Sequence, residues 1–211
     1  MGTACQVTLT ASIEAGPDGA GFVRAGIGMD NEALAQLGDP ATELRLDDLR
    51  AAGWTVTGPV RERDGLTWVR IAHRFTSPAE ATRLAAQLGE PFQGLRLVRR
   101  RSFLKTKTRL TGSIDLSKGL AAFSDPALQA ALGGADLGAL TDDNVHLRFE
   151  ARLQGQTRTW SPKLGEQVDI AAQAQSWNTG PVAAAIAAVA AVAAVAFALT
   201  GLVAVFAARR R

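Results

Sequence analysis

A chain of 211 residues with one cysteine and two histidines cannot form an internal disulfide and lacks the ligands of a Cys/His structural zinc site. Three of its 23 basic residues are the C-terminal Arg209, Arg210 and Arg211, and the remaining 20 balance the 20 acidic residues. The net charge of +3 is therefore a property of the C-terminus, and it gives no reason to expect nucleic-acid binding.

The first quarter of the chain predicts a β-hairpin followed by two short helices. Apolar and polar residues alternate over residues 6–14, a Gly-Pro-Asp-Gly turn follows, and residues 22–29 are expected to form the returning strand. Helices are expected over residues 32–37 and 46–52, because a capping Asp or Asn precedes the first and Gly53 follows the second.

A second hairpin and the clearest helix come next. Strands are predicted over residues 54–61 and 66–75, joined at Asp64-Gly65. Ser77 is expected to cap the following helix, since Pro78 suits a first helical turn and Glu80 completes a capping box.

The chain from residue 95 to residue 177 predicts more strands. They are expected over residues 95–101, 102–116, 145–153 and 167–177, with a short helix over 125–133 and a loop over 157–165. In the second of these strands the residues expected to face inward are Leu104, Thr106, Thr108, Leu110, Ile114 and Leu116. Hairpins with inserted helices indicate an α+β fold on a mostly antiparallel sheet.

The C-terminal part predicts a single transmembrane helix over about residues 181–208. Residues 182–208 contain no charge, amide or histidine, and at about 1.5 Å per residue they exceed a hydrocarbon core of roughly 30 Å. The alternative is a buried alanine-rich core helix, but a globular helix of that length normally shows a polar stripe. We therefore expect an outer domain over residues 1–178 and a membrane segment with a short basic tail over 179–211.

Charge around this segment predicts its orientation. Arg209, Arg210 and Arg211 follow it directly, whereas residues 173–180 carry no charge, so the C-terminus is expected to be cytoplasmic and the domain extracytoplasmic. Trp177 either lies among the lipid headgroups or closes the last strand of the domain. Ala183, Ala187 and Ala191 form a small-residue ridge that is a weak indication of helix dimerisation.

Cys5 admits two interpretations. Residues 2–5 read Gly-Thr-Ala-Cys, like the end of a bacterial lipobox with Gly2 in place of the usual leucine, which predicts a longer precursor and a lipid on Cys5. Alternatively, Cys5 begins the alternating pattern that continues through Val7 and Leu9, and is a small core residue.

No constellation of residues predicts catalysis. His73 and His146 occur in no metal-binding spacing and are expected to be ordinary strand residues, and no nucleophile elbow or phosphate loop occurs. The paired acids Asp47-Asp48 and Asp142-Asp143 are typical of helix caps or turns. We expect no enzyme activity and no cofactor.

Clustered positive charge is the unusual feature of the domain. No acidic residue occurs between Glu90 and Asp115, and this stretch contains Arg96, Arg99, Arg100, Arg101, Lys105, Lys107 and Arg109. These cations are expected to hold anionic lipid headgroups of the membrane to which the domain is tethered. The alternative is a solvated sheet face whose cations discourage edge-to-edge pairing.

The sequence over about residues 5–177 resembles the LppM-like family of actinobacterial envelope lipoproteins. The stretches that carry the resemblance are the strand beginning at Cys5, the Asp-Asp-Leu-Arg-Ala-Ala-Gly-Trp of residues 47–54, the Arg-Ser-Phe of 101–103 leading to Leu-Thr-Gly-Ser-Ile-Asp-Leu at 110–116, and the Trp-Ser-Pro-Lys-Leu-Gly-Glu of 160–166. The resemblance implies an extracytoplasmic α+β domain without known enzyme activity that binds envelope lipids or glycolipids. It assigns no functional residue.

Two functions follow as hypotheses. The first is a membrane-anchored binding domain for an envelope lipid or glycolipid, with Arg99, Arg100, Arg101, Lys105, Lys107 and Arg109 as headgroup ligands. The second is a protein interaction module of an envelope complex, which requires a membrane-protein partner.

Overall fold

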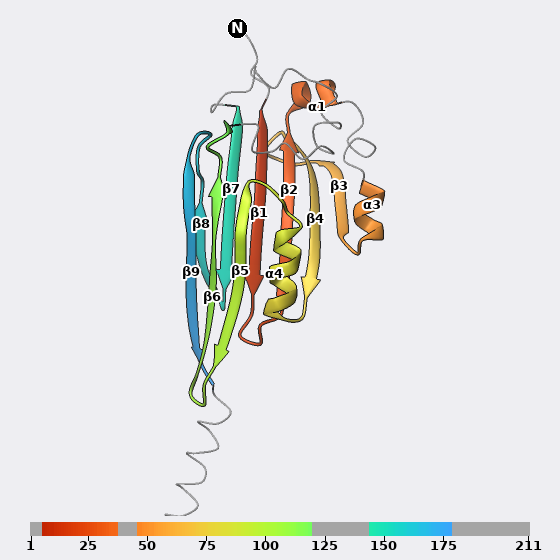
Figure 1. The fold of residues 1–211 in the computed structure, drawn as a ribbon. Coiled ribbons are helices and arrows are strands. Elements are labelled where there is room, and N and C mark those ends of the chain that lie inside the picture. The colour runs from red at the N-terminus through yellow and green to blue at the C-terminus, as the bar shows by residue number, and fades with distance from the viewer. Residues whose placement is uncertain (1–5, 38–45, 120–143, 179–211) are drawn as a thin grey trace, which may run out of the picture.

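The computed structural model describes residues 6–37, 46–119 and 144–178 (Figure 1). Within them the chain forms two β-sheets and the helices α1 (Asn31–Leu37), α3 (Leu46–Ala51) and α4 (Pro78–Ala86). The α+β class and the mostly antiparallel pairing predicted from the sequence are confirmed. The structure divides the strands between two sheets, a division that the sequence did not predict.

The larger sheet has six strands in the order β3-β4-β2-β1-β7-β8. They are β1 (Val7–Ala15), β2 (Gly21–Met29), β3 (Thr55–Arg61), β4 (Thr67–Phe75), β7 (Val145–Leu153) and β8 (Gln156–Trp160). Neighbouring strands are antiparallel except β1 and β7, which run parallel with Val7 opposite Val145. The first strand of the domain is therefore an interior strand of this sheet.

The smaller sheet has three antiparallel strands in the order β5-β6-β9, namely β5 (Phe92–Arg101), β6 (Lys105–Asp115) and β9 (Gln167–Trp177). Each strand of this sheet has buried residues on one face and exposed residues on the other. A sheet with one apolar face must bury that face against another layer, and here the two sheets bury their faces against each other.

The core lies between the two sheets, with α4 beside β5 covering the part of the larger sheet formed by β2 and β4 (Figure 1). Its largest fully buried side chains are Phe75, Phe149, Ile13, Leu110, Ile114, Leu116, Leu153 and Ile170. Among the residues predicted to face inward on β6, Thr106 and Thr108 are also buried. Leu104 is instead 46% exposed, because the strand begins only at Lys105.

Helix α4 begins at the predicted cap residue Ser77, but the return bond of Glu80 goes to the N–H of Thr76, one residue before the cap, where a capping box uses the N–H of the cap residue itself. The Glu80 N–H donates to Ser77 Oγ at 3.3 Å, Pro78 occupies the first turn, and Glu80 Oε2 accepts from the Thr76 N–H at 2.8 Å. Thr82 Oγ1 accepts from the Leu97 N–H at 3.1 Å, so the helix also satisfies a donor at the free edge of β5.

The loop predicted over residues 157–165 is wrong in its first half, because β8 occupies Gln156–Trp160. β8 is an edge strand whose first four residues are exposed, so its sequence carries no apolar alternation. It follows a tight turn at Gln154-Gly155, with φ of 49° and 84°, where Gln replaces the Asn or Asp that usually signals such a turn.

The two chain ends of the described domain lie at opposite ends of the sandwich (Figure 1). β1 starts at one end of the sandwich, and β9 finishes at the other end, beside the β5–β6 turn. The transmembrane helix and the short helix predicted over residues 181–208 and 125–133 fall outside the described residues. None of the helices within the described ranges has the length and apolarity to cross a bilayer.

Candidate functional site

The outer face of the smaller sheet gathers most of the basic residues singled out in the sequence. Strand register places Arg100 opposite Lys107, and Lys107 opposite Gln175 on β9. Because directly paired residues share a face, the cations on this face are Arg96, Arg100, Lys105, Lys107 and Arg109. We call this surface the basic face.

The cations of the basic face are not neutralised. Among the described residues, no carboxylate lies within ion-pair distance of any of the five. The acids of the same face, Asp115 and Asp169, belong to the ends of β6 and β9 that lie away from the β5–β6 turn. The face is therefore positive towards that turn.

Two of the predicted headgroup ligands lie on the other side of the sheet. Arg99 pairs with Thr108 and Arg101 with Thr106, two residues that face the core. Arg99 Nε donates to the Pro17 carbonyl at 2.9 Å, which joins β5 to the β1–β2 turn, whereas Arg101 remains exposed at the strand end. The structure thus separates Arg99 and Arg101 from the other predicted ligands.

Edge protection does not explain the cations of β6. Lys105, Lys107 and Arg109 belong to the central strand of the smaller sheet, both of whose edges are paired. The free edges belong to β5 and β9. At the edge of β9, Nη1 of the β8 residue Arg158 donates to the Ala171 carbonyl at 3.1 Å. Cations on a central strand remain available for a ligand above the face.

The basic face ends at the β5–β6 turn, where the chain also leaves the domain. Trp177 is opposite Lys105 and is 62% exposed, and the Lys105 ammonium lies 4.3 Å from the centre of the indole ring. Of the two interpretations given for Trp177, the last-strand position is confirmed. Its side chain is also exposed, as contact with headgroups would require.

A solved domain has a similar structure. It is the NMR structure of the folded domain of the Mycobacterium tuberculosis LppM protein, with a TM-score of 0.49 and 15% sequence identity over 84% of this chain and 95% of that domain. The protein found by this comparison agrees with the family that the sequence resembles. No protein-family model and no curated protein matches the chain. The surfaces described here are argued from the residues of this chain.

The outer face of the larger sheet carries a groove of about 500 Å³ that the sequence did not predict. Its polar lining comes from β1, β2, β3, β4 and β7 and consists of Thr10, Ser12, Arg24, Thr55, Thr57, Arg70, Arg148 and Glu150. These residues are widely separated in sequence, and only the strand order β3-β4-β2-β1-β7 brings them together.

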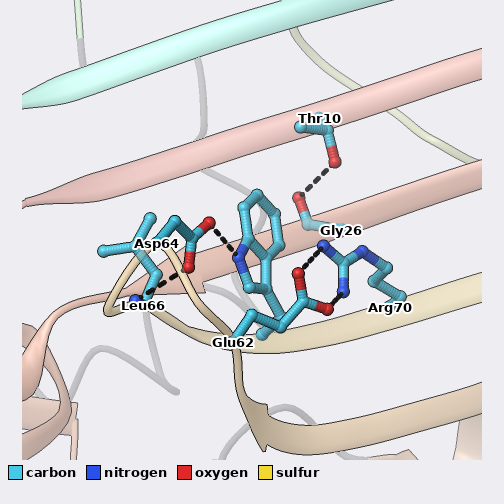
Figure 2. Close-up of polar contacts among 7 residues, drawn as sticks. Thr10, Gly26, Glu62, Asp64, Leu66 and Arg70 are labelled. Carbon is cyan, nitrogen blue, oxygen red and sulfur yellow. Dashed lines mark hydrogen bonds and ion pairs between the residues drawn. The ribbon is translucent and has the colours of Figure 1, made fainter.

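Charges in the groove are paired, unlike those of the basic face. Arg24 Nη1 lies 2.6 Å from Glu14 Oε2, and Arg148 Nη2 lies 3.5 Å from Glu150 Oε2. Arg70 donates to both carboxylate oxygens of Glu62, one of them at 3.0 Å (Figure 2). The groove therefore offers hydroxyls and compensated guanidinium groups, which suit a neutral polar group better than an anion.

Two glycines of β2 make room for Trp68 and for its neighbour Arg70, which lines the groove. A Cβ at Gly28 would lie 2.7 Å from the ring of Trp68, and one at Gly26 would lie 3.1 Å from Arg70 Cγ. The Arg70 guanidinium carbon in turn lies 4.2 Å from the centre of the Trp68 ring. The glycines thus allow Trp68 and Arg70 to lie flat against the sheet.

Asp64 holds Trp68 in this position through hydrogen bonds (Figure 2). Its carboxylate accepts from Trp68 Nε1 at 2.9 Å and from the Leu66 N–H at 3.0 Å. These bonds, with that from Trp68 the stronger cause, hold the pKa of Asp64 below its ordinary value of 3.8.

The depressed pKa of Asp64 predicts how stability changes in acid. A carboxylate whose pKa is lower in the folded state stabilises the fold above its unfolded-state pKa, and this contribution is lost as the pH falls through the folded-state pKa. We expect Asp64→Asn to unfold at a lower temperature than wild type at neutral pH and to show a weaker decline in acid. Thermal unfolding from neutral pH to below 3.8 tests this, and parallel profiles of the two proteins would contradict it.

Other candidate residues take ordinary positions or fall outside the description. His73 and His146 lie in β4 and β7, which confirms the prediction that they are strand residues. Within the described ranges, no group of three His, Cys, Asp or Glu side chains is placed to hold a metal ion. Cys5 and residues 209–211 are not among the residues that the structure describes, so lipidation and topology stay predictions.

Proposed function

We propose that the protein is a membrane-anchored extracytoplasmic domain that binds an anionic envelope lipid or glycolipid, with the basic face as the headgroup site. The observation that carries the proposal is the group of five cations without carboxylate partners among the described residues. They lie on the outer surface of the smaller sheet. The end of the basic face at the β5–β6 turn adjoins Asn178, the last described residue of the domain. Anchoring itself rests on the apolar sequence of residues 182–208.

The spacing of the basic face suits phosphate. Cations on neighbouring strands lie about 5 Å apart and those two residues apart on one strand about 7 Å, so Arg100 and Lys107 can contact one phosphate from two sides. A Lys or Arg near an anionic membrane surface contributes about 1 kcal/mol to binding. The groove lies on the opposite outer surface of the sandwich and its charges are compensated, so we assign the anion to the basic face.

A matched pair of variants tests the proposal. The test variant is Arg100→Gln/Lys107→Gln, and the control is Arg61→Gln/Arg63→Gln, which removes the same charge at the opposite end of the domain. The full chain in non-ionic detergent is titrated with phosphatidylglycerol or phosphatidylcholine, and lipid adducts are counted by native mass spectrometry. We expect the test variant to lose roughly 30-fold in apparent affinity for phosphatidylglycerol, which corresponds to about 2 kcal/mol.

The control separates the domain from its membrane segment. Lipid bound to residues 182–211 is common to wild type and both variants, so only the difference between the variants reports on the basic face. Equal affinities of the two variants, or equal adducts with phosphatidylglycerol and phosphatidylcholine, would refute the headgroup site. We would then turn to an interaction module of an envelope complex.

A further inference from the structure

The turn between β5 and β6 has apolar residues at its apex. The Ser102 N–H donates to the Lys105 carbonyl at 2.8 Å, which closes a two-residue turn formed by Phe103 and Leu104. Such positions are normally taken by Gly, Asn, Asp or Ser, because these residues tolerate both the turn conformation and water. Here Phe103 is 69% exposed and Leu104 46% exposed.

Trp177 extends this apolar surface, and we call Phe103, Leu104 and Trp177 the tip. Three of the five large apolar side chains that are exposed among the described residues are those of the tip. The other two, Phe22 and Val60, belong to the larger sheet. Exposed apolar residues are normal when scattered singly, so their concentration at one end of the domain indicates a contact surface.

Hydrogen bonds hold the tip to the chain exit. The Asn178 N–H donates to the Leu104 carbonyl at 2.8 Å, and Asn178 Nδ2 donates to the Ser102 carbonyl at 2.6 Å. Thr106 Oγ1 donates to Asn178 Oδ1 at 2.7 Å. The last described residue is thus fixed to the turn from both its backbone and its side chain.

The predicted membrane segment begins three residues after Asn178. A chain covers at most about 3.6 Å per residue, so residue 181 lies within about 11 Å of Asn178. If the apolar segment enters the bilayer there, the tip is at the depth of the headgroups. Figure 1 shows that the β5–β6 turn projects beyond the other turns at this end of the domain.

We propose that the tip inserts into the headgroup layer of the bilayer that holds the C-terminal segment, so that the strands stand upright on the membrane. This proposal rests on the anchoring part of the proposed function. The occupant is a lipid surface because Phe103, Leu104 and Trp177 adjoin Arg100, Arg101 and Lys105, and apolar residues next to cations are typical of segments that lie in an anionic interface.

If the strands stand upright, the cations of the basic face lie at different distances from the membrane surface. Lys105 and Arg109 are separated by four strand residues, or about 14 Å, whereas the interfacial layer is roughly 5–8 Å thick and the Debye length about 8 Å. Cations near the turn therefore contact bilayer headgroups. Arg96 and Arg109 stand above that layer, where they can contact only the headgroup of a lipid that is partly drawn out of the bilayer.

Spin labels on the full chain test the insertion. In a Cys5→Ser background, which leaves no other cysteine, a nitroxide is attached to Phe103→Cys or, as the matched control, to Val60→Cys at the opposite end of the domain. Both positions are exposed, so neither substitution disturbs the core. The chain is incorporated into vesicles of equal parts phosphatidylcholine and phosphatidylglycerol, and the collision rates of the label with oxygen and with a water-soluble nickel chelate are measured.

We expect the ratio of oxygen to nickel collisions to be several-fold higher at residue 103 than at residue 60. If the chain floats with the vesicles but the two labels give equal ratios, the insertion is refuted while the anchor stands. If the chain does not float with the vesicles, the anchor fails and the insertion with it. If the difference disappears when the protein is diluted in lipid, the tip packs against a second copy of the chain, which also refutes insertion.

Discussion

Replacing Phe149 by alanine is expected to lower the free energy of unfolding by about 3–5 kcal/mol, the largest stability effect that we predict for one side chain. Phe149 lies on β7 and is fully buried between the two sheets. Its ring centre is 5.6 Å from that of Phe92 on β5 and 5.9 Å from that of Trp160 on β8. The deletion would leave a cavity between strands of both sheets, which cannot close without moving one sheet against the other.

The matched control for this prediction is Phe103→Ala, the same deletion at the 69% exposed tip. It creates no cavity, so we expect a change within about 0.5 kcal/mol. Urea unfolding of the detergent-solubilised chain, followed by near-UV circular dichroism, compares the two variants. Equal losses would mean that Phe103 stabilises the fold, and the interpretation of the tip as a contact surface would lose its support.

Substituting alanine for Gly28 is expected to lower stability by about 1–3 kcal/mol through overpacking. The added Cβ would lie 2.7 Å from two ring atoms of Trp68, an indole that is itself buried and hydrogen-bonded to Asp64. Relief requires the ring to move, and this movement would break the stacking of Arg70 on the ring. The variant is therefore expected to shift the fluorescence of Trp68 as well as the unfolding midpoint.

Gly26→Ala provides the control on the same strand and the same face. Its nearest neighbours would be Thr10 Oγ1 at 3.0 Å and Arg70 Cγ at 3.1 Å, both in side chains that can rotate away. We expect a loss of less than about 1 kcal/mol from this change. A larger loss for Gly26→Ala than for Gly28→Ala would show that Trp68 does not limit the packing over β2.

Local sequence signals predicted most elements because each depends on neighbouring residues. Alternation located β1 and β4, and the cap formed by Ser77 and Glu80 located α4. β8 was missed because an exposed edge strand has no inward apolar series. The division into two sheets also escaped prediction, since it depends on which strands pair and not on the pattern within any one strand.

The same distinction applies to the binding surfaces. The basic face was predictable as a charge cluster because Arg100 and Lys107 belong to consecutive strands of one hairpin. The separation of Arg99 from the other cations could not be predicted, because the face on which Arg99 lies depends on the register of β5. The groove had no signal in the sequence, since Arg24, Arg70 and Arg148 come together only through the strand order of the larger sheet.

The parallel pairing of β1 with β7 has a consequence for how the chain folds. Val7 meets Val145, so this contact closes a loop of 138 positions, and long-range contacts of this kind slow folding because chain entropy is lost before the contact forms. The smaller sheet likewise cannot form completely until β9 has been synthesised, and β9 is the last strand before the predicted membrane segment. Neither sheet can be completed early in synthesis. A chain that is exported during synthesis would thus remain open for most of its passage, and it would close only when its membrane segment arrives.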